Sequence, residues 1–97
     1  MTTTIRIAGL CSTDVSSRSN ASDLRRKIIA LVQAGSNVEL DLGDVRTISD
    51  SFADELFGVL ARDKGSDWFR QWIQIKNAEE FPRATILDEI KNRLQLT

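Results

Sequence analysis

The sequence of 97 residues predicts an α/β domain in which helices pack against a mainly parallel sheet. Short apolar runs with strand-like alternation are separated by longer runs whose apolar residues recur at helical spacing. The resulting order is β-α-β-α-β-α, and strands that alternate with helices favour parallel pairing. With 41% hydrophobic and 28% charged residues, the composition is ordinarily globular, so we expect a single domain over residues 1–97.

The first strand is predicted at residues 3–8, where Ile5 and Ile7 fall on one face. Residues 9–20 are rich in Ser, Thr and Asp and predict a loop.

A first helix is predicted over residues 20–34, with Asn20 or Ser22 as its N-terminal cap and Gly35 as its stop. Apolar residues recur along it at helical spacing, at Leu24, Ile28, Leu31 and Val32.

A second strand is expected at residues 37–42, and a helix follows at residues 51–62. The strand is marked by alternating Val38, Leu40 and Leu42. The helix has one apolar stripe, formed by Phe52, Leu56, Val59 and Leu60. Phe57 lies one residue off this stripe, and a place in the core is favoured over a place on a partner surface.

The last third of the chain predicts a turn at residues 64–66, a strand at residues 72–76 and a final helix that ends near residue 95. Pro82 suits the first turn of that helix. Its buried face is expected at Ile86 or Leu87, Ile90 and Leu94. A satellite aromatic cluster that covers one end of the sheet is expected from Trp68, Phe69 and Trp72.

Overall composition argues against several kinds of partner and location. The formal net charge is −1, from 13 basic and 14 acidic residues, so bulk charge supports neither a nucleic-acid nor an anionic-membrane partner. No apolar run approaches the roughly 20 residues that span a bilayer. The N-terminus does not resemble a signal peptide, and the single cysteine, Cys11, cannot form an internal disulfide. We therefore expect a cytoplasmic protein.

The residue types also argue against an enzyme. The chain has no histidine, which excludes Ser-His-Asp and Cys-His relays and any histidine-based metal site. The 5 glycines are scattered, so no glycine-rich phosphate loop is present. Adjacent carboxylates such as Asp54 and Glu55 point about 100° apart on a helix and do not converge on one proton-transfer site. We expect no catalytic residue, metal or cofactor.

The most informative polar cluster is Ser49-Asp50-Ser51, at the start of the helix predicted for residues 51–62. Each of these side chains can cap the free backbone amides of a first helical turn. Polar side chains at a helix start beside a sheet edge also fit partner recognition or phosphorylation. The residues by themselves leave capping, partner contact and phosphorylation open.

Residues 38–60 resemble the STAS domain, which is named for sulfate transporters and anti-sigma factor antagonists. The resemblance rests on Leu-Asp-Leu-Gly-Asp-Val at residues 40–45 and on Ile-Ser-Asp-Ser-Phe-Ala-Asp-Glu-Leu at residues 48–56. More closely, the segment resembles a bacterial STAS-like family of unknown function whose members have a helix start of the Ser-Phe-Ala-Asp-Glu-Leu type. This resemblance implies a small STAS-like sandwich.

In STAS antagonists, a serine at the start of the helix after the central strand is phosphorylated by a kinase with a histidine-kinase-like ATPase fold, and the phosphate switches partner binding. The resemblance places Asp50 at that position, with Ser49 and Ser51 beside it as candidate phosphorylation sites. It implies a non-enzymatic, partner-switching interaction module whose partner is such an ATPase regulator. The expected docking surface is formed by Asp44, Thr47, Ser49, Asp50, Ser51 and Asp54.

STAS-like relatives tend to place an arginine before the first long helix, which corresponds to Arg18 here, and we expect it to pair with an acidic group near Ser49. Two other functions stay open. The start of the helix at residues 51–62 can hold a small ligand such as a nucleotide, because helix N-termini bind phosphate. The chain can also be a phage or mobile-element accessory protein that blocks a host complex.

Overall fold

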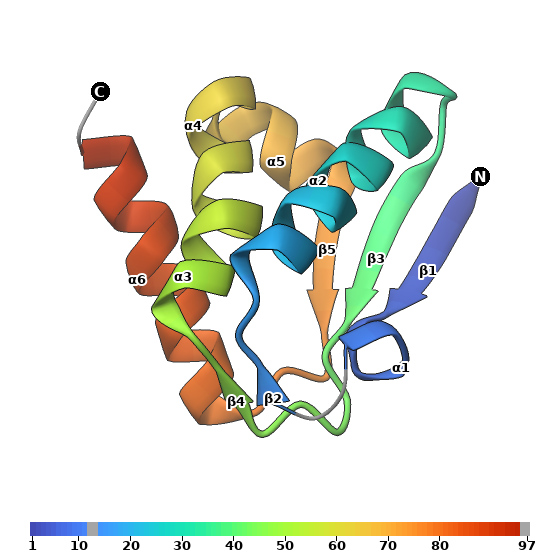
Figure 1. Cartoon of the computed structure of the whole chain (residues 1–97). Coiled ribbons are helices and arrows are strands. Elements are labelled where there is room, and N and C mark those ends of the chain that lie inside the picture. Colours follow the sequence, from blue (N-terminus) through green and yellow to red (C-terminus); the bar gives the residue numbers. More distant parts are fainter. Residues whose placement is uncertain (12–13, 96–97) are drawn as a thin grey trace.

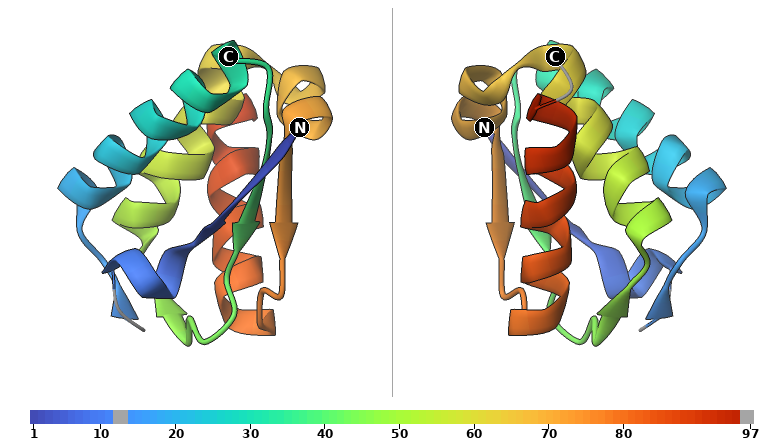
Figure 2. Two further views of the ribbon diagram at one scale, coloured as in Figure 1. Left: turned by 90° about the vertical axis from the view of Figure 1, so that its right-hand side faces the viewer. Right: turned by 90° about the vertical axis from the view of Figure 1, so that its left-hand side faces the viewer.

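A computed structural model describes residues 1–11 and 14–95. It has an α/β fold, as predicted, with a three-stranded parallel sheet and helices α2, α4 and α6 on the same side of it (Figure 1, Figure 2). In chain order the elements are β1 (Thr2–Arg6), α1 (Ile7–Cys11), β2 (Asp14–Val15), α2 (Arg18–Gln33), β3 (Asn37–Asp41), β4 (Thr47–Ile48), α3 (Asp50–Ala53), the π-helical turn η1 (Asp54–Gly58), α4 (Val59–Lys64), α5 (Ser66–Trp72), β5 (Ile73–Lys76) and α6 (Glu80–Gln95).

The main sheet has the strand order β1-β3-β5, and both neighbouring pairs are parallel. Its register aligns Ile5 with Leu40, and Leu40 with Ile75. Side chains alternate along each strand, so these apolar residues share the face that packs on the helices. The predicted strand at residues 72–76 is confirmed except for its first residue, which belongs to α5.

The opposite face of the sheet is polar. Thr4 donates a hydrogen bond to Glu39 across 3.0 Å, and Lys76 forms an ion pair with Glu39 at 2.9 Å. These side chains come from three neighbouring strands. The hydrogen bonds lower the pKa of Glu39, with the bond from Lys76 as the larger cause. The molecule therefore has two layers, with its apolar core between the sheet and the helices.

The segment predicted as a loop at residues 9–20 contains regular structure. The first strand ends at Arg6, and the buried Ile7 begins α1 instead of continuing the strand. Strand β2 then pairs in parallel with β4. Residues 12–13 lie outside the described residues. Helix α2 begins at Arg18, earlier than predicted, because the side chain of Ser17 caps it by accepting a hydrogen bond from Asn20 N.

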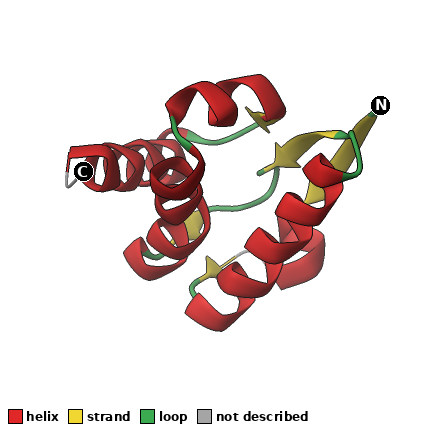
Figure 3. Cartoon of the chain, turned by 90° about the horizontal axis from the view of Figure 1, so that it is seen from above, coloured by secondary structure: helices red, strands yellow, loops and turns green. Residues whose placement is uncertain are grey.

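Elements α3, η1 and α4 follow one another without a break and form the central helix of the molecule (Figure 3). Residues from Leu56 to Ala61 are all buried, because α2, α6 and the sheet surround this helix. Phe57 is 0% exposed, which confirms the prediction that it belongs to the core. The predicted helix at residues 51–62 is confirmed, although its π-helical turn was not anticipated.

Helix α5 was not predicted. It follows Gly65, whose φ of 91° lets the chain turn sharply after α4. Trp68, Phe69 and Trp72 are partly buried and pack against the core, as expected of a satellite cluster. In α6, Pro82 lies in the first turn as predicted, and Ile86 rather than Leu87 is the buried residue.

Candidate functional site

The loop after β3 is fixed by the side chain of Asp41, which ends the central strand. Asp41 Oδ1 accepts hydrogen bonds from Gly43 N at 2.8 Å and from Asn77 Nδ2 at 3.0 Å. These bonds, with that of Asn77 as the larger cause, lower the pKa of Asp41. Asp44 follows with a φ of 68° and forms an ion pair with Arg6 from the end of β1. The loop toward the candidate helix is thereby held against the ends of all three strands.

Ser49 is the N-terminal cap of α3. Its Oγ accepts a hydrogen bond from Phe52 N at 3.0 Å, which satisfies one of the free amides of the first turn. The same hydroxyl donates to the backbone oxygen of Ser16 at 3.1 Å. Because β2 and β4 are paired, and they precede α2 and α3, the N-termini of these two helices lie side by side (Figure 1). The capping interpretation is confirmed for Ser49.

The other residues of the predicted docking surface differ in exposure. Asp44, Thr47, Asp50 and Ser51 are exposed, and Ser49 is half-buried. Asp50 and Ser51 form the first turn of α3, where acidic side chains interact favourably with the helix dipole. The candidate residues thus lie along the loop and helix start beyond the carboxyl ends of the strands (Figure 1).

Asp54, unlike the exposed residues of the predicted docking surface, is half-buried and pairs with arginine. Its two carboxylate oxygens accept hydrogen bonds from Arg93 Nε and Nη2 at 2.6 and 2.7 Å. The nearest nitrogen of Arg18 lies 3.5 Å from the same carboxylate. The bonds from Arg93, ahead of that from Arg18, hold the pKa of Asp54 below its usual range. A carboxylate paired in this way links the central helix to α6.

Glu55 links the central helix to α2. It accepts a hydrogen bond from Arg18 at 3.0 Å and forms an ion pair with Arg25. Arg25 also donates to the backbone oxygen of Glu55. These contacts lower the pKa of Glu55, with Arg25 as the larger cause. The predicted pairing of Arg18 with an acidic group near Ser49 is therefore confirmed, and its partners are Asp54 and Glu55.

Helix α6 packs closely against the π-helical turn at Gly58. A Cβ atom at this position would lie 2.9 Å from Arg93 Cγ, 2.9 Å from Asp54 Oδ1 and 3.2 Å from the backbone oxygen of Glu89. Desolvation, followed by the charges of Asp54 and Asp50, raises the pKa of Glu89. The carboxylates of Asp50 and Asp54 therefore lie close enough to that of Glu89 for their charges to interact.

Arg25, Glu89 and Arg93 are not among the site residues predicted from the sequence. Arg93 lies 39 residues from its partner Asp54, and no local pattern in the sequence connects them. The arginine partners lower the pKa of both carboxylates of η1, which makes them weaker bases. Within the described part of the chain, no three acidic or cysteine side chains gather to hold a metal ion. Among the same residues, no helix is both long and apolar enough to cross a bilayer.

Comparison with known proteins gives one match. Residues 20–81 match the model of a family described as STAS-like domain of unknown function (DUF4325). Comparisons with curated proteins and with solved structures give no significant match. The matched segment runs from α2 to the start of α6 and includes β3, the cap Ser49 and the π-helical turn. The chain therefore belongs to the family of STAS-like domains of unknown function.

Proposed function

We propose that this chain is a non-enzymatic interaction module that docks a protein partner through the start of α3. The observation that carries the proposal is the exposure of Asp50 and Ser51 on a helix start whose backbone is fixed by Ser49. Membership of a STAS-like family supports a partner of the anti-sigma-factor regulator type, with a histidine-kinase-like ATPase domain.

A rigid frame supports the proposed surface. Arg18 and Arg25 tie Glu55 to α2, and Arg93 ties Asp54 to α6. The helix that begins with Asp50 is thus held on both sides, one turn after the exposed residues. A preorganised surface loses less conformational entropy when a partner binds.

The charge of the surface indicates the chemistry of the partner. Asp50 has a fixed negative charge where the related antagonists have a phosphorylated serine, and a phosphoserine carries about −1.5 to −2. Glu89 and Asp50 lie close enough for their charges to interact. A partner with a basic contact surface fits this arrangement, whereas a free anion such as a nucleotide would be repelled.

Ser51 is the better candidate for regulation by phosphorylation. Ser49 uses its hydroxyl as acceptor and donor within the chain, so a phosphate there would remove the hydrogen bond that Ser49 donates to the backbone oxygen of Ser16. Ser51 is exposed in the first turn of α3, where a phosphate would interact favourably with the helix dipole. It would also strengthen the negative charge next to Asp50.

The proposal is tested by co-purification from cells of the organism that encodes the chain. Tagged wild-type protein is compared with Asp50→Lys and with Asp63→Lys by quantitative mass spectrometry. Asp63 is a matched control because it is exposed at the far end of α4. We expect an ATPase or anti-sigma-type regulator that Asp50→Lys loses and Asp63→Lys retains.

Two results would contradict the proposal. In one, all three proteins recover the same partners, and Asp50 then has only a structural role. In the other, no regulator is recovered, and nucleotides raise the melting temperature of the purified wild-type protein. That second result would assign the start of α3 to a small ligand.

A further inference from the structure

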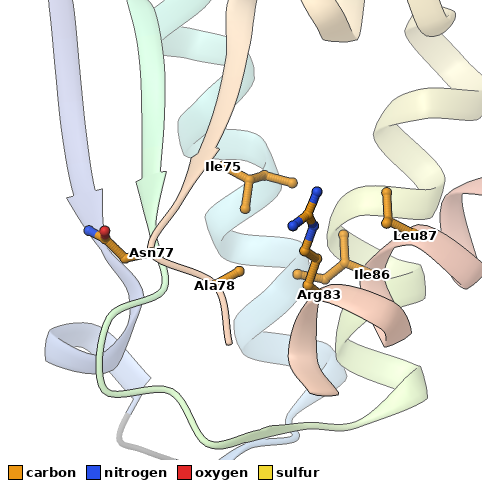
Figure 4. Close-up of a pocket in the computed structure, with 6 residues that line it drawn as sticks. All are labelled: Ile75, Asn77, Ala78, Arg83, Ile86 and Leu87. Carbon is orange, nitrogen blue, oxygen red and sulfur yellow. The ribbon is translucent and has the colours of Figure 1, made fainter. Parts of the chain in front are cut away.

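A second surface lies between strand β5 and helix α6, away from the start of α3. Two cavities of about 420 Å³ and about 270 Å³ adjoin there, since Ile75 and Leu87 line both of them. Figure 4 shows the first cavity, with Ile75 from the strand facing side chains from α6. We call this surface the β5–α6 groove and define it by Phe69, Arg70, Ile75, Arg83, Leu87 and Ile90.

The groove leaves apolar side chains of α6 in contact with solvent. Ile86 is buried in the core, whereas the next residue, Leu87, is 48% exposed. A helix that packs on a core with one face normally has polar residues on its other faces. On the side of β5, the exposed Leu87 therefore extends the apolar surface of α6 beyond Ile90, which is partly buried against the core.

Arg83 is placed in this apolar surface without a charged partner. Within the described residues, its guanidinium group forms no hydrogen bond or ion pair. In Figure 4 the group lies between Ile75 and Leu87. At the other end of the groove, Arg70 forms an ion pair with Asp67 at 3.3 Å, and both side chains are highly exposed. The groove therefore combines an apolar floor with two cations and favours an occupant that carries a carboxylate.

The position of the groove beside the edge strand β5 favours an extended occupant. From Arg83 to Ile90 the groove follows about two turns of α6, which is a length of about 10 Å. Three residues of an extended chain span the same length, at about 3.3 Å each. Strand β5 pairs with β3 on one side only, among the described residues, so its other edge can pair with an added strand.

We propose that the β5–α6 groove binds an extended acidic segment of a protein partner. An aliphatic or aromatic side chain of the segment packs between Ile75 and Leu87, and a neighbouring carboxylate pairs with Arg83. A second copy of this chain fits less well, because a symmetric contact would bring Arg70 and Arg83 of both copies together. The proposal does not depend on the docking function assigned to the start of α3.

The experiment is a selection of peptides from a random display library on the immobilised full chain. We expect enrichment of sequences in which Asp or Glu stands next to or two residues from Leu, Ile or Phe. A synthetic peptide of the enriched sequence should bind Arg83→Glu at least about tenfold more weakly than the wild type. Its binding to Lys91→Glu, a charge-matched change on α6 outside the groove, and to Asp50→Lys should be unchanged.

A second measurement locates the bound peptide on the protein. In spectra of ¹⁵N-labelled protein, the enriched peptide should shift the backbone amides of β5 and of residues 83–90. The proposal is overturned if the library yields no enrichment, if the enriched peptides lack acidic residues, or if Arg83→Glu binds them as tightly as the wild type. It is also overturned if the chain self-associates in sedimentation experiments and Arg83→Glu abolishes this, because the occupant is then a second copy.

Discussion

Ser49 and Ser51 lie two residues apart, and their hydroxyl groups have different surroundings. The preference of serine for helix caps is visible in the sequence, and Ser49 has that role. Its second partner, the backbone oxygen of Ser16, lies 33 residues away and depends on the pairing of β2 with β4. The sequence therefore placed the cluster at a helix start, whereas only the tertiary structure separates the serine that forms hydrogen bonds from the exposed one.

Asp54→Asn should destabilise the fold because it removes the charged acceptor of Arg93. Hydrogen bonds to charged groups contribute about 1.5–3 kcal/mol. We expect the lower part of this range for the free energy of unfolding, since the side chain of Arg93 is 25% exposed. Urea denaturation measures the change. Asp23→Asn is the matched control, because its ion pair with Arg26 is exposed and should contribute less than about 1 kcal/mol.

The effect of Asp54 should depend on pH. Its pKa is lower in the folded chain than its ordinary value of 3.8, so the unfolded chain binds a proton first as the pH falls. The stabilisation by the ionised Asp54 is complete at pH values well above 3.8. It is lost as the pH falls through the lower pKa that Asp54 has in the folded chain. The difference between wild type and Asp54→Asn should therefore shrink in acid. A difference that stays constant down to the folded pKa would contradict the assigned ion pair.

Glu89→Gln should stabilise the fold, in contrast to Asp54→Asn. The pKa of Glu89 is raised in the folded chain, so its ionised form opposes folding above that pKa. We expect Glu89→Gln to raise the free energy of unfolding at neutral pH by about 0.2–1 kcal/mol, as for other exposed charge interactions. The gain should vanish below the ordinary value of 4.5, where the carboxyl is protonated in both states. Thermal unfolding at several pH values measures this gain. A loss of stability in Glu89→Gln at neutral pH would contradict the assigned effect of Glu89.

At the scale of elements, the apolar stripe of the central helix is visible in the sequence, whereas its π-helical turn depends on packing in the folded protein. Its apolar stripe predicted the helix correctly, but the π-helical turn η1 could not be inferred from it. This turn lies where α6 packs closely against Gly58, and the contacts there involve residues of α6 such as Glu89. Helix α5 was missed for a related reason, because its aromatic residues face the core without a full helical repeat.

Gly58→Ala should destabilise the fold although alanine favours helices by about 1 kcal/mol. The added Cβ would lie within 3.2 Å of the backbone of α6, and overpacking of this kind typically costs about 1–3 kcal/mol. Gly9→Ala is the matched control, since nothing lies within 4 Å of a Cβ at that position. Denaturation curves of both variants measure the change in the free energy of unfolding. If Gly58→Ala were as stable as the wild type, the prediction would be wrong, because α6 could then shift at no cost.

At the scale of the whole molecule, the parallel sheet determines where the candidate surface lies. The alternation of strands and helices in the sequence predicted the parallel sheet, and parallel strands bring their carboxyl ends to one edge. The loop after β3 and the start of α3 both lie at that end (Figure 1). The ion pairs that support them come from α2 and α6, and only the assembled fold joins these helices to the site.

The central claim is that the start of α3 docks a protein partner, and the most direct test is the dissociation constant of the purified regulator that co-purifies with the chain. We expect Asp50→Lys to weaken binding by about tenfold or more, and added salt to weaken binding of the wild type. Asp63→Lys should bind like the wild type. Equal affinities for the wild type and Asp50→Lys, with both proteins folded, would contradict the claim.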